Sequence, residues 1–460
     1  MSAISPARMA AFQILMAVER GRAHSGDLLR GRHVTALSPA DRNLATALVL
    51  GVLRWQIQLD HEIKRFLTKP GARIDSEVLI ALRIGAFQLR HFDRIPARAA
   101  IDESVELAKL AGHRFASKMV NAVLRKLGTN APEEASPETP AELSLFKAHP
   151  QWLVERWANN FGFSQACAVC NYDQAPPKTT LRIGAAVAEE ELAAAGIQLE
   201  RAELLTSART VAAGEVTSTE SFREGKVRIQ DEGSQLIAEL AAFAGSADPT
   251  GGTRKVLDAC AAPGGKTLIL LERDSDARVV ACEASEPRLV QLKKRLAEFS
   301  DRVEFRFGDA TKLQFDGTLD VVLADVPCSG TGTLARNPEI RHRLRAGDLP
   351  RHTERQHAIL KAALSAVRPG GHVVYSTCSL EPEENEQVVA RVLSEMMNVR
   401  QCQLAPTLEK MTTVGILNTD AAAKLGECLT QEGALRLLPG RFGTDGFFIA
   451  LLQSDDRVRQ

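Results

Sequence analysis

The sequence predicts an α/β protein in which a doubly wound parallel sheet follows an all-helical domain and a small α+β subdomain. In residues 6–127, apolar residues recur at spacings of three and four, which is typical of amphipathic helices. From Arg254 onward, short apolar runs alternate with helical stretches, an order typical of a parallel sheet that binds ligands at the carboxyl ends of its strands. We expect a helical domain at 1–130, a linker at 131–142, the α+β subdomain at 143–245 and the sheet domain at 246–460.

The helical domain is expected to carry a surplus of positive charge. Ser38, Pro39 and Asp41 mark the start of one of its helices. Residues 1–130 contain 20 Lys and Arg but 11 Asp and Glu, although the whole chain has a formal net charge of zero. This surplus indicates either contact with a polyanion or solvated helix faces, and charge alone leaves both open. The segment APEEASPETPAE that follows is rich in Pro and Glu and is typical of a linker.

Composition restricts the class of protein. Of 460 residues, 45% are apolar and 25% charged, and no apolar run approaches the length of about 18 that a membrane span needs. The N-terminus does not resemble a secretion signal, so we expect a cytoplasmic protein. Eight scattered cysteines indicate reduced thiols. Cys167 and Cys170 form a lone CxxC, which favours helix packing, and we expect no metal site.

The remaining elements follow from short patterns. In the α+β subdomain, HPQWLVERWANNFG predicts a helix, TTLRIG a strand, AEEELAAAG a helix, and FREGKVRIQDEGSQLIAELAAF a strand that runs into a helix. The sheet domain has predicted strands in KVLDAC, RVVACEA, VEFRFGDA, LDVVLADV and HVVYSTCS, and SEPRLVQLKKRLAEF and ERQHAILKAALSAV predict helices between them. GFFIALLQ, near the end of the chain, is expected to be an edge strand.

A glycine-containing loop follows the first strand of the sheet domain. Its sequence is DACAAPGGKT, residues 258–267, whose small residues let the backbone approach a ligand while the next helix offers free N–H groups. A phosphate-binding loop would need glycine where Cys260 stands, although VVLAD could serve as the acidic strand of such an ATPase. The dinucleotide fingerprint G-x-G-x-x-G is absent.

S-adenosylmethionine is the third ligand that such a loop could bind. Glu283 follows the second strand, where an acid would hold the ribose hydroxyls of this cofactor. Asp309 follows the third strand, where a polar group would meet the adenine edge, and Asp325 ends the fourth. Any one of these acids could cap a helix. Three of them in order around a glycine loop also suit a cationic sulfonium and favour S-adenosylmethionine.

Two cysteines stand at the ends of neighbouring strands, Cys328 in ADVPCSG and Cys378 in YSTCSLEPEE. A core cysteine is usually an inert small hydrophobe, but these two fall on the face where the cofactor is expected. Carbon 5 of cytosine is a poor nucleophile, and a thiolate added to carbon 6 makes it reactive toward a sulfonium methyl group. Asp325, if protonated, could donate to ring nitrogen 3. Because the base must leave its stack, single-stranded or loop RNA is the expected substrate.

The motifs DACAAPGGKT, DVPCSGTG and YSTCSLEPEENE together resemble the RNA cytosine-5 methyltransferase family. The layout is similar to that of its bacterial small-subunit rRNA enzymes of the Sun/Fmu (RsmB) type, with support from FREGKVRIQDEGSQ and LPGRFGTDGFFIA. The resemblance covers essentially the whole chain. It implies a NusB-like helical domain, a small RNA-binding subdomain and a Rossmann-like methyltransferase domain. It also implies 16S rRNA as the substrate, either as naked RNA or within an assembling small subunit.

The resemblance also implies roles for single residues. Cys378 would be the nucleophile, and Cys328 would help to resolve the adduct, by removing the proton from carbon 5 or by releasing the enzyme. DNA cytosine-5 methyltransferases take their nucleophile from the Pro-Cys motif, so Thr-Cys-Ser after the fifth strand favours RNA. The NusB-like domain would hold rRNA through its phosphates. The implied cofactor contacts are Cys260, Ala261, Ala262, Pro263, Gly264, Gly265, Lys266, Glu283, Asp309 and Asp325.

Three features depart from the family pattern. Glu283 stands where Asp is commoner, and Ser-Gly-Thr-Gly-Thr and Arg-Asn-Pro-Glu at 336–339 replace Ala-Thr-Gly and Arg-His-Pro-Asp. These changes concern the ribose contact and the choice of nucleotide, and they leave the catalytic residues in place. A rival hypothesis is a non-enzymatic RNA-binding or assembly factor with a relic catalytic domain. The retained cysteine pair and the intact glycine loop argue against it.

Overall fold

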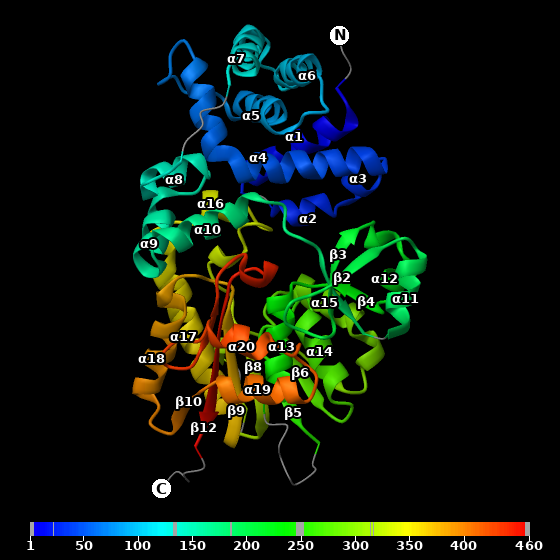
Figure 1. Ribbon diagram of the computed structural model, residues 1–460, viewed down its shortest axis with the longest axis vertical. Coiled ribbons are helices and arrows are strands. Elements are labelled where there is room, and N and C mark those ends of the chain that lie inside the picture. The colour runs from blue at the N-terminus through cyan, green and yellow to red at the C-terminus, as the bar shows by residue number, and fades with distance from the viewer. Residues whose placement is uncertain are drawn as a thin grey trace. The chain divides into compact units, whose positions relative to one another are not determined.

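The fold was derived from a computed structural model, which describes residues 4–21, 23–131, 136–184, 186–244, 253–312, 314–315 and 317–455. It contains two units (Figure 1): Met1–Pro176 with Leu334–Leu344, and Pro177–Thr333 with Arg345–Gln460. The predicted α/β class is confirmed, with helices before a mixed sheet. The predicted α+β subdomain is divided, since its first helices belong to the first unit and its sheet to the second. Of the predicted linker, residues 132–135 lie outside the described residues, and a helix begins at Pro140.

A helical bundle with a large apolar core forms most of the first unit. Helix α4 starts as predicted, since the Ser38 side chain accepts from the amide of Asp41. A Cβ atom at Gly51 would come within 1.9 Å of the Phe87 ring, so glycine permits the close contact between α4 and α5. The helices of the bundle are α1 (Pro6–Glu19), α2 (Ser25–Leu29), α3 (Arg32–Thr35), α4 (Pro39–Phe66), α5 (Ser76–His91), α6 (Ala97–Leu110) and α7 (Ser117–Thr129).

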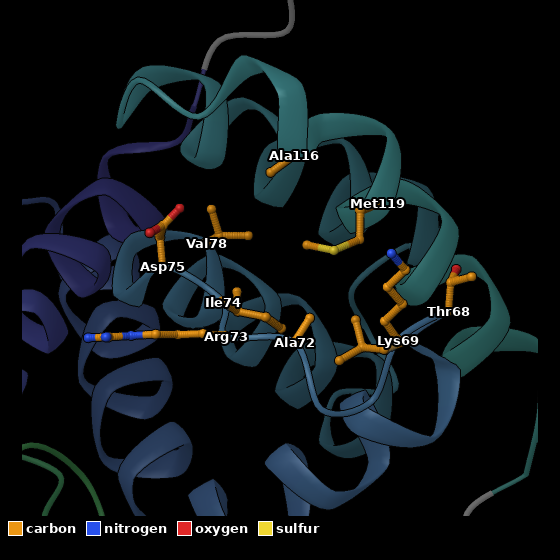
Figure 2. A pocket seen from close by; sticks show the side chains of 10 residues that line it. Thr68, Lys69, Ala72, Arg73, Ile74, Asp75, Val78, Ala116 and Met119 are labelled. Carbon is orange, nitrogen blue, oxygen red and sulfur yellow. The ribbon is translucent and has the colours of Figure 1, made fainter.

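The bundle contains an apolar pocket of about 330 Å³ (Figure 2). Its wall includes Ile74, two residues before α5, Val78 at the start of α5 and Met119 on α7. Lys69 and Arg73 from the connection between α4 and α5 also line it. All of its lining residues belong to the helical unit.

Residues 334–344, which we call the anchor segment, belong to the first unit although the sheet domain surrounds them in sequence. They include helix α16 (Ile340–Arg343), which contacts α4 and α10 (Phe163–Gln174) through Arg341. The same unit contains α8 (Pro140–Phe146) and α9 (Gln151–Phe161). The Arg341 side chain is 1% exposed and donates to the carbonyl oxygens of Arg54 and Asp173, both at 2.9 Å. Glu339 accepts from the amide and the hydroxyl of Ser25. Burial lowers the pKa of Arg341 to about 10.

The second unit contains two sheets. The smaller one is antiparallel, with strand order β2-β3-β1-β4. The larger one has the order β10-β12-β9-β8-β5-β6-β7, with β11 paired to β12, and its strands β5 to β9 are parallel. The strands are β1 (Thr180–Ile183), β2 (Gln198–Arg201), β3 (Ala208–Ala213), β4 (Val227–Ile229), β5 (Lys255–Asp258), β6 (Arg278–Glu283), β7 (Val303–Phe307), β8 (Leu319–Asp325), β9 (Val367–Thr377), β10 (Val399–Cys402), β11 (Leu435–Leu437) and β12 (Phe447–Ser454).

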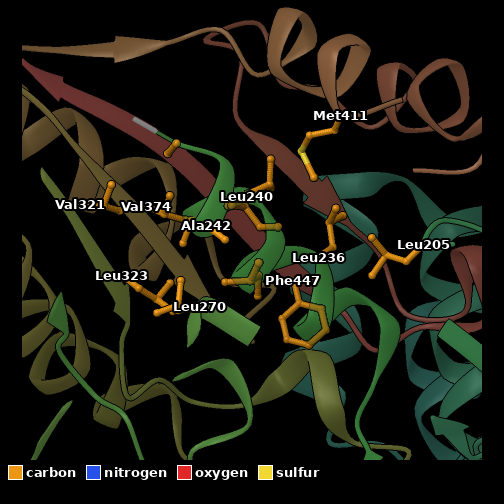
Figure 3. Packing of buried hydrophobic residues seen from close by; sticks show 14 of the residues in the cluster. Leu205, Leu236, Leu240, Ala242, Leu270, Val321, Leu323, Val374, Met411 and Phe447 are labelled. Carbon is orange, nitrogen blue, oxygen red and sulfur yellow. The ribbon is translucent and has the colours of Figure 1, made fainter. Parts of the chain in front are cut away.

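Helices cover both faces of the larger sheet, which explains why its strands are almost continuously apolar. On one face, Leu236 and Leu240 of α13 pack in a cluster with Leu323 and Val374 (Figure 3). On the other face, side chains of α17 and α18 pack against residues that alternate with these. The helices of this unit are α11 (Ala186–Ala194), α12 (Glu220–Arg223), α13 (Glu232–Phe243), α14 (Gly265–Arg273), α15 (Glu286–Arg295), α17 (Leu349–Ala366), α18 (Glu386–Glu395), α19 (Ala405–Thr413) and α20 (Ala421–Gly426).

The predicted position of the last strand is wrong. GFFIALLQ forms β12, but this strand lies inside the sheet, between β9 and β10, and not at its edge. The reason is that β10, with the short sequence VRQC, pairs with the outer side of β12. Among the described residues, no helix combines the length and apolarity that crossing a membrane requires.

Candidate active site

The glycine loop connects β5 to α14, at the carboxyl end of the sheet. Asp258 ends β5 and is buried, and its carboxylate accepts from the Thr267 hydroxyl at 2.7 Å. Gly264 has a φ of 98°, a left-handed conformation that favours glycine, and α14 begins at the next residue. Burial raises the pKa of Asp258 to about 6, with the Thr267 hydrogen bond acting against that shift.

Two pockets flank the loop and share Cys260. One, of about 300 Å³, is lined by residues that include Glu283 and Arg288. The other, of about 140 Å³, is lined by residues that include Gln230, Lys266 and Asp325. Of the other residues expected to contact the cofactor, Ala261, Ala262, Pro263 and Gly265 line the smaller pocket, whereas Gly264 and Asp309 line neither.

Two of the predicted acids have defined partners at the larger pocket. The carboxylate of Glu283 accepts from the amide of Ser285 at 2.8 Å and lies 3.4 Å from the Arg288 guanidinium. Asp309 lies between two residues that line this pocket, and its carboxylate accepts from the amide of Thr311 at 3.0 Å. That hydrogen bond lowers the pKa of Asp309.

Lys266 and Asp325 form an ion pair at the smaller pocket. The Lys266 Nζ atom lies 2.7 Å from Oδ2 of Asp325, and the Ser376 hydroxyl donates to Oδ1 at 2.7 Å. Burial is the largest single influence and acts to lower the pKa of Lys266, but the charge and hydrogen bond of Asp325, together with the nearby charges of Asp258 and Cys378, raise it overall. Sequence patterns assigned Lys266 only to the cofactor loop. This ion pair depends on the contact between distant segments, which no local pattern reports.

The structure brings Cys328 and Cys378 together. Their sulfur atoms are 3.1 Å apart, and the amide of Cys378 donates to the Cys328 sulfur at 3.3 Å. The cause is the sheet, in which β8 and β9 are parallel neighbours with Asp325 opposite Ser376. The turns that follow these strands therefore start side by side. The hydrogen bond with Cys378, together with burial, raises the pKa of Cys328.

A buried polar cluster behind the two cysteines has no counterpart in the sequence predictions. Glu384 accepts from the amide of Ser329 at 2.9 Å, from Gln356 at 2.8 Å, and from the hydroxyls of Ser329 and Ser379. The acid-rich sequence EPEENE was the only signal for it, and it does not show which acid is buried.

The arrangement is suited to covalent chemistry on a ring. A pair of thiols and an amine–carboxylate pair lie at the ends of neighbouring strands, next to pockets around a glycine loop. A thiol can add to an electron-poor carbon, and a second thiol in contact with it can move a proton. Within the part of the chain that the structure describes, no trio of His, Cys, Asp or Glu could hold a metal ion.

Comparison with known proteins adds to this picture. A family described as "16S rRNA methyltransferase RsmB/F" matches residues 247–453, the NusB family matches 5–129, and an RsmF/B-like ferredoxin-like domain matches 149–214. The "Probable ribosomal RNA small subunit methyltransferase B" of Bacillus subtilis is 33% identical over 96% of this chain and 97% of its own. A "Ribosomal RNA small subunit methyltransferase B" of Pseudomonas putida is 32% identical over 97% and 98%. The crystal structure of PH0851 shares the fold, with a TM-score of 0.76 at 22% identity over 98% of this chain and all of its own.

Proposed function

Because the chain belongs to the 16S rRNA methyltransferase RsmB/F family, we propose that it methylates carbon 5 of a cytosine in 16S rRNA, with S-adenosylmethionine as the methyl donor. The observation that carries the proposal is the distance of 3.1 Å between the Cys328 and Cys378 sulfur atoms. A cytosine adduct needs a nucleophile at carbon 6 and a base at carbon 5, which are adjacent ring atoms. Two thiols in contact meet that need.

The residues around the glycine loop fit S-adenosylmethionine. Glu283 is 6% exposed and lines a pocket of about 300 Å³, where its carboxylate can accept from vicinal ribose hydroxyls. The loop and the first turn of α14 offer backbone N–H groups, and Asp325 adds negative charge that suits a sulfonium. When bound, this cofactor supplies an electrophilic methyl group.

Cys378 acts as the nucleophile. Because the pKa of Cys328 is raised, Cys328 retains its proton and can donate it to the Cys378 sulfur, 3.1 Å away. The Cys378 sulfur adds to carbon 6 of the cytosine as a thiolate, and carbon 5 then takes the methyl group. When the proton leaves carbon 5, the bond between the Cys378 sulfur and carbon 6 breaks and the thiolate returns.

Cys328 accepts the proton from carbon 5. The hydrogen bond to Cys378 and the charge of Cys378 are among the causes that raise its pKa. Both causes disappear once the Cys378 sulfur is bonded to the ring. The pKa of Cys328 therefore falls, its thiol gives up its proton to solvent, and the resulting thiolate takes the proton from carbon 5.

Proton donation to ring nitrogen 3 belongs to the Lys266–Asp325 pair. The Lys266 ammonium, 2.7 Å from the Asp325 carboxylate, can supply this proton through the carboxylate, and the pair takes it back when the Cys378 sulfur leaves carbon 6. The Ser376 hydroxyl holds the other carboxylate oxygen and so fixes the orientation of Asp325.

Replacement of Cys378 by Ala tests the proposal. We expect methyl transfer from labelled S-adenosylmethionine to 16S rRNA to fall at least about 1,000-fold, because the adduct cannot form. Calorimetry should show cofactor binding within about twofold of wild type, since Cys378 lines neither pocket at the loop. Bisulfite sequencing should locate the product as 5-methylcytosine. Cys167→Ala, on α10 in the other unit, is the control and should retain full activity. Methyl transfer by the Cys378 variant would refute the proposal.

A further inference from the structure

Glu384 stands outside the chemistry proposed above, yet its contacts concern both cysteines. It ends a short 3-10 turn before α18, and its side chain has no exposed surface. Oε1 accepts from the Ser329 amide and from the Gln356 side chain, while Oε2 accepts from the hydroxyls of Ser329 and Ser379. One carboxylate therefore receives four donors.

The positions of the two serines give these contacts their meaning. Ser329 directly follows Cys328, and Ser379 directly follows Cys378. Their hydroxyl oxygens are 3.0 Å apart and both point at the same carboxylate oxygen. Glu384 therefore binds both turns, the one with Cys328 and the one with Cys378. Any displacement of one turn would shift Glu384 and so strain its hydrogen bonds to the other turn.

A carboxylate is the side chain that this site requires. Its two oxygens have about four lone-pair positions and no proton, so it can accept from four donors. A glutamine has a single acceptor oxygen, and its NH₂ group would face donors that are already buried. Buried donors without an acceptor are costly, so the turns would move to relieve them.

We propose that Glu384 is a positioning residue that sets the separation of the Cys328 and Cys378 sulfur atoms, an inference that rests on the proposed cytosine chemistry. Nucleophile and base must reach adjacent atoms of one ring at the same time. A misplacement of about 1 Å at such a site can cost about 100-fold in rate. Loss of Glu384 therefore acts on the chemical step and leaves the binding of RNA and cofactor in place.

The turns keep other ties when Glu384 is changed, so the protein should still fold. The amide of Leu380 donates to the Thr331 hydroxyl at 2.9 Å, and the amide of Gly332 donates to the Cys378 carbonyl at 2.9 Å. Gly332 is also fixed from its other side, because the Gly446 amide donates to its carbonyl at 2.7 Å. These backbone contacts hold the turns near each other, and Glu384 determines the final register.

Glu384→Gln tests the inference in the full-length protein, with Glu395→Gln as the matched control. Glu395 lies at the other end of α18 and pairs with Lys361 and His357 at the surface. We expect kcat to fall about 100-fold for Glu384→Gln, with KM for RNA and Kd for the cofactor within about threefold of wild type. The control should match wild type in all three. A kcat for Glu384→Gln within threefold of wild type would overturn the inference, as would a loss confined to KM.

The trapped adduct separates this inference from the proposed function. RNA with 5-fluorocytidine at the target cannot lose a proton from carbon 5, so the adduct persists and its rate of formation can be followed on denaturing gels. Wild type should form it, Cys378→Ala should not, and Glu384→Gln should form it about 100-fold more slowly. If wild type forms none, the cytosine chemistry fails. If Glu384→Gln forms it at the wild-type rate, only the positioning role fails.

Two further measurements distinguish positioning from general support. Removing both hydroxyl donors, in Ser329→Ala with Ser379→Ala, should lower kcat by a similar factor, and adding Glu384→Gln should cost little more. If the kcat losses of the serine variant and of Glu384→Gln multiply in the combined variant, the three residues do not act through one shared set of hydrogen bonds. If Glu384→Gln fails to fold, the kcat of the serine variant tests the positioning role by itself. The Glu384 charge also helps to raise the pKa of Cys328, so Glu384→Gln should move the pH profile of adduct release to lower pH. If the pH profile of adduct release does not move, Glu384 does not act on Cys328.

Discussion

At Cys328, several neighbours act on one thiol. The hydrogen bond with Cys378 is the largest cause of its raised pKa, burial is the second, and the charges of Cys378 and Glu384 follow. The backbone at Gly330 acts in the opposite direction. The two largest causes differ in kind, since burial persists through the reaction while the contact with a free Cys378 sulfur does not. The same thiol can thus be a donor at the start and a base later.

Replacement of Cys328 by Ala should separate the two halves of the reaction. Cys378 can still add to carbon 6, but no thiol remains to take the proton from carbon 5, so the methylated adduct should accumulate. We expect a protein–RNA band that survives denaturing gels and needs S-adenosylmethionine, with turnover reduced at least about 100-fold. Cys378→Ala should give no band under the same conditions. Full turnover without a band would show that Cys328 is not needed for release.

Asp258→Asn should change how stability depends on pH. The folded-state pKa of Asp258 is raised from 3.8 to about 6, so the folded protein binds more protons than the unfolded chain between these values. Asp258 therefore contributes its full stabilisation of the folded state below about pH 4, where it is protonated, and this contribution is lost as the pH rises to about 6. We expect Asp258→Asn to unfold at higher denaturant than wild type at pH 7.5, by about 3 kcal/mol, and to lose most of that advantage at pH 4. A difference that does not vary with pH would contradict this assignment.

At the scale of elements, the sheet determines which motifs meet. The sequence predicts the strands that end near Cys328 and Cys378, because apolar runs with polar ends report buried strands locally. It also predicts that both strands end at the same edge, because parallel strands in a doubly wound sheet do so. It does not report that Lys266 pairs with Asp325 or that Glu384 contacts Ser329, since those neighbours are set by tertiary packing. The misplacement of β12 has the same origin, because the pairing with β10 is not visible in either segment alone.

Replacement of Arg341 by Met tests the anchor segment. The guanidinium donates to backbone carbonyls of Arg54, Ala148 and Asp173, and methionine would remove this donor from all three buried acceptors. We expect the free energy of unfolding of the helical unit to fall by about 3 kcal/mol, measured by chemical denaturation. Arg351→Met is the control, since Arg351 is 78% exposed and should change stability by less than about 0.5 kcal/mol. Equal stability of the two variants would show that the anchor contributes little.

At the scale of the molecule, charge is divided along the chain. Residues 1–130 have 20 Lys and Arg against 11 Asp and Glu, so the rest of the chain carries the compensating negative surplus. The fold class follows from periodicity over long segments and is therefore accessible from sequence. Residues 334–344 join the helical unit through buried contacts such as those of Arg341. Neither the composition nor the spacing of residues in the sequence predicts this.

Binding of 16S rRNA should weaken steeply with salt. If the basic helical unit holds phosphates, each neutralised phosphate releases counterions, and the logarithm of affinity should fall linearly with the logarithm of salt concentration. We expect a loss of at least about 100-fold in affinity between about 50 and 200 mM KCl, whereas cofactor binding should change little. Fluorescence anisotropy with a labelled rRNA fragment measures the first and calorimetry the second. An RNA affinity independent of salt would rule out phosphate contacts as its main source.

The anchor segment constrains how this architecture can change in evolution. A helical unit built from 1–176 alone could be gained or lost by one cut and one fusion. Here the helical unit also includes residues 334–344, which are encoded within the sheet domain. If the first 176 residues were removed, Arg341 would lose its carbonyl acceptors. A relative without the helical unit should therefore also have a different sequence in the segment that corresponds to residues 334–344. The sequence of that stretch should therefore indicate which relatives still have the helical unit.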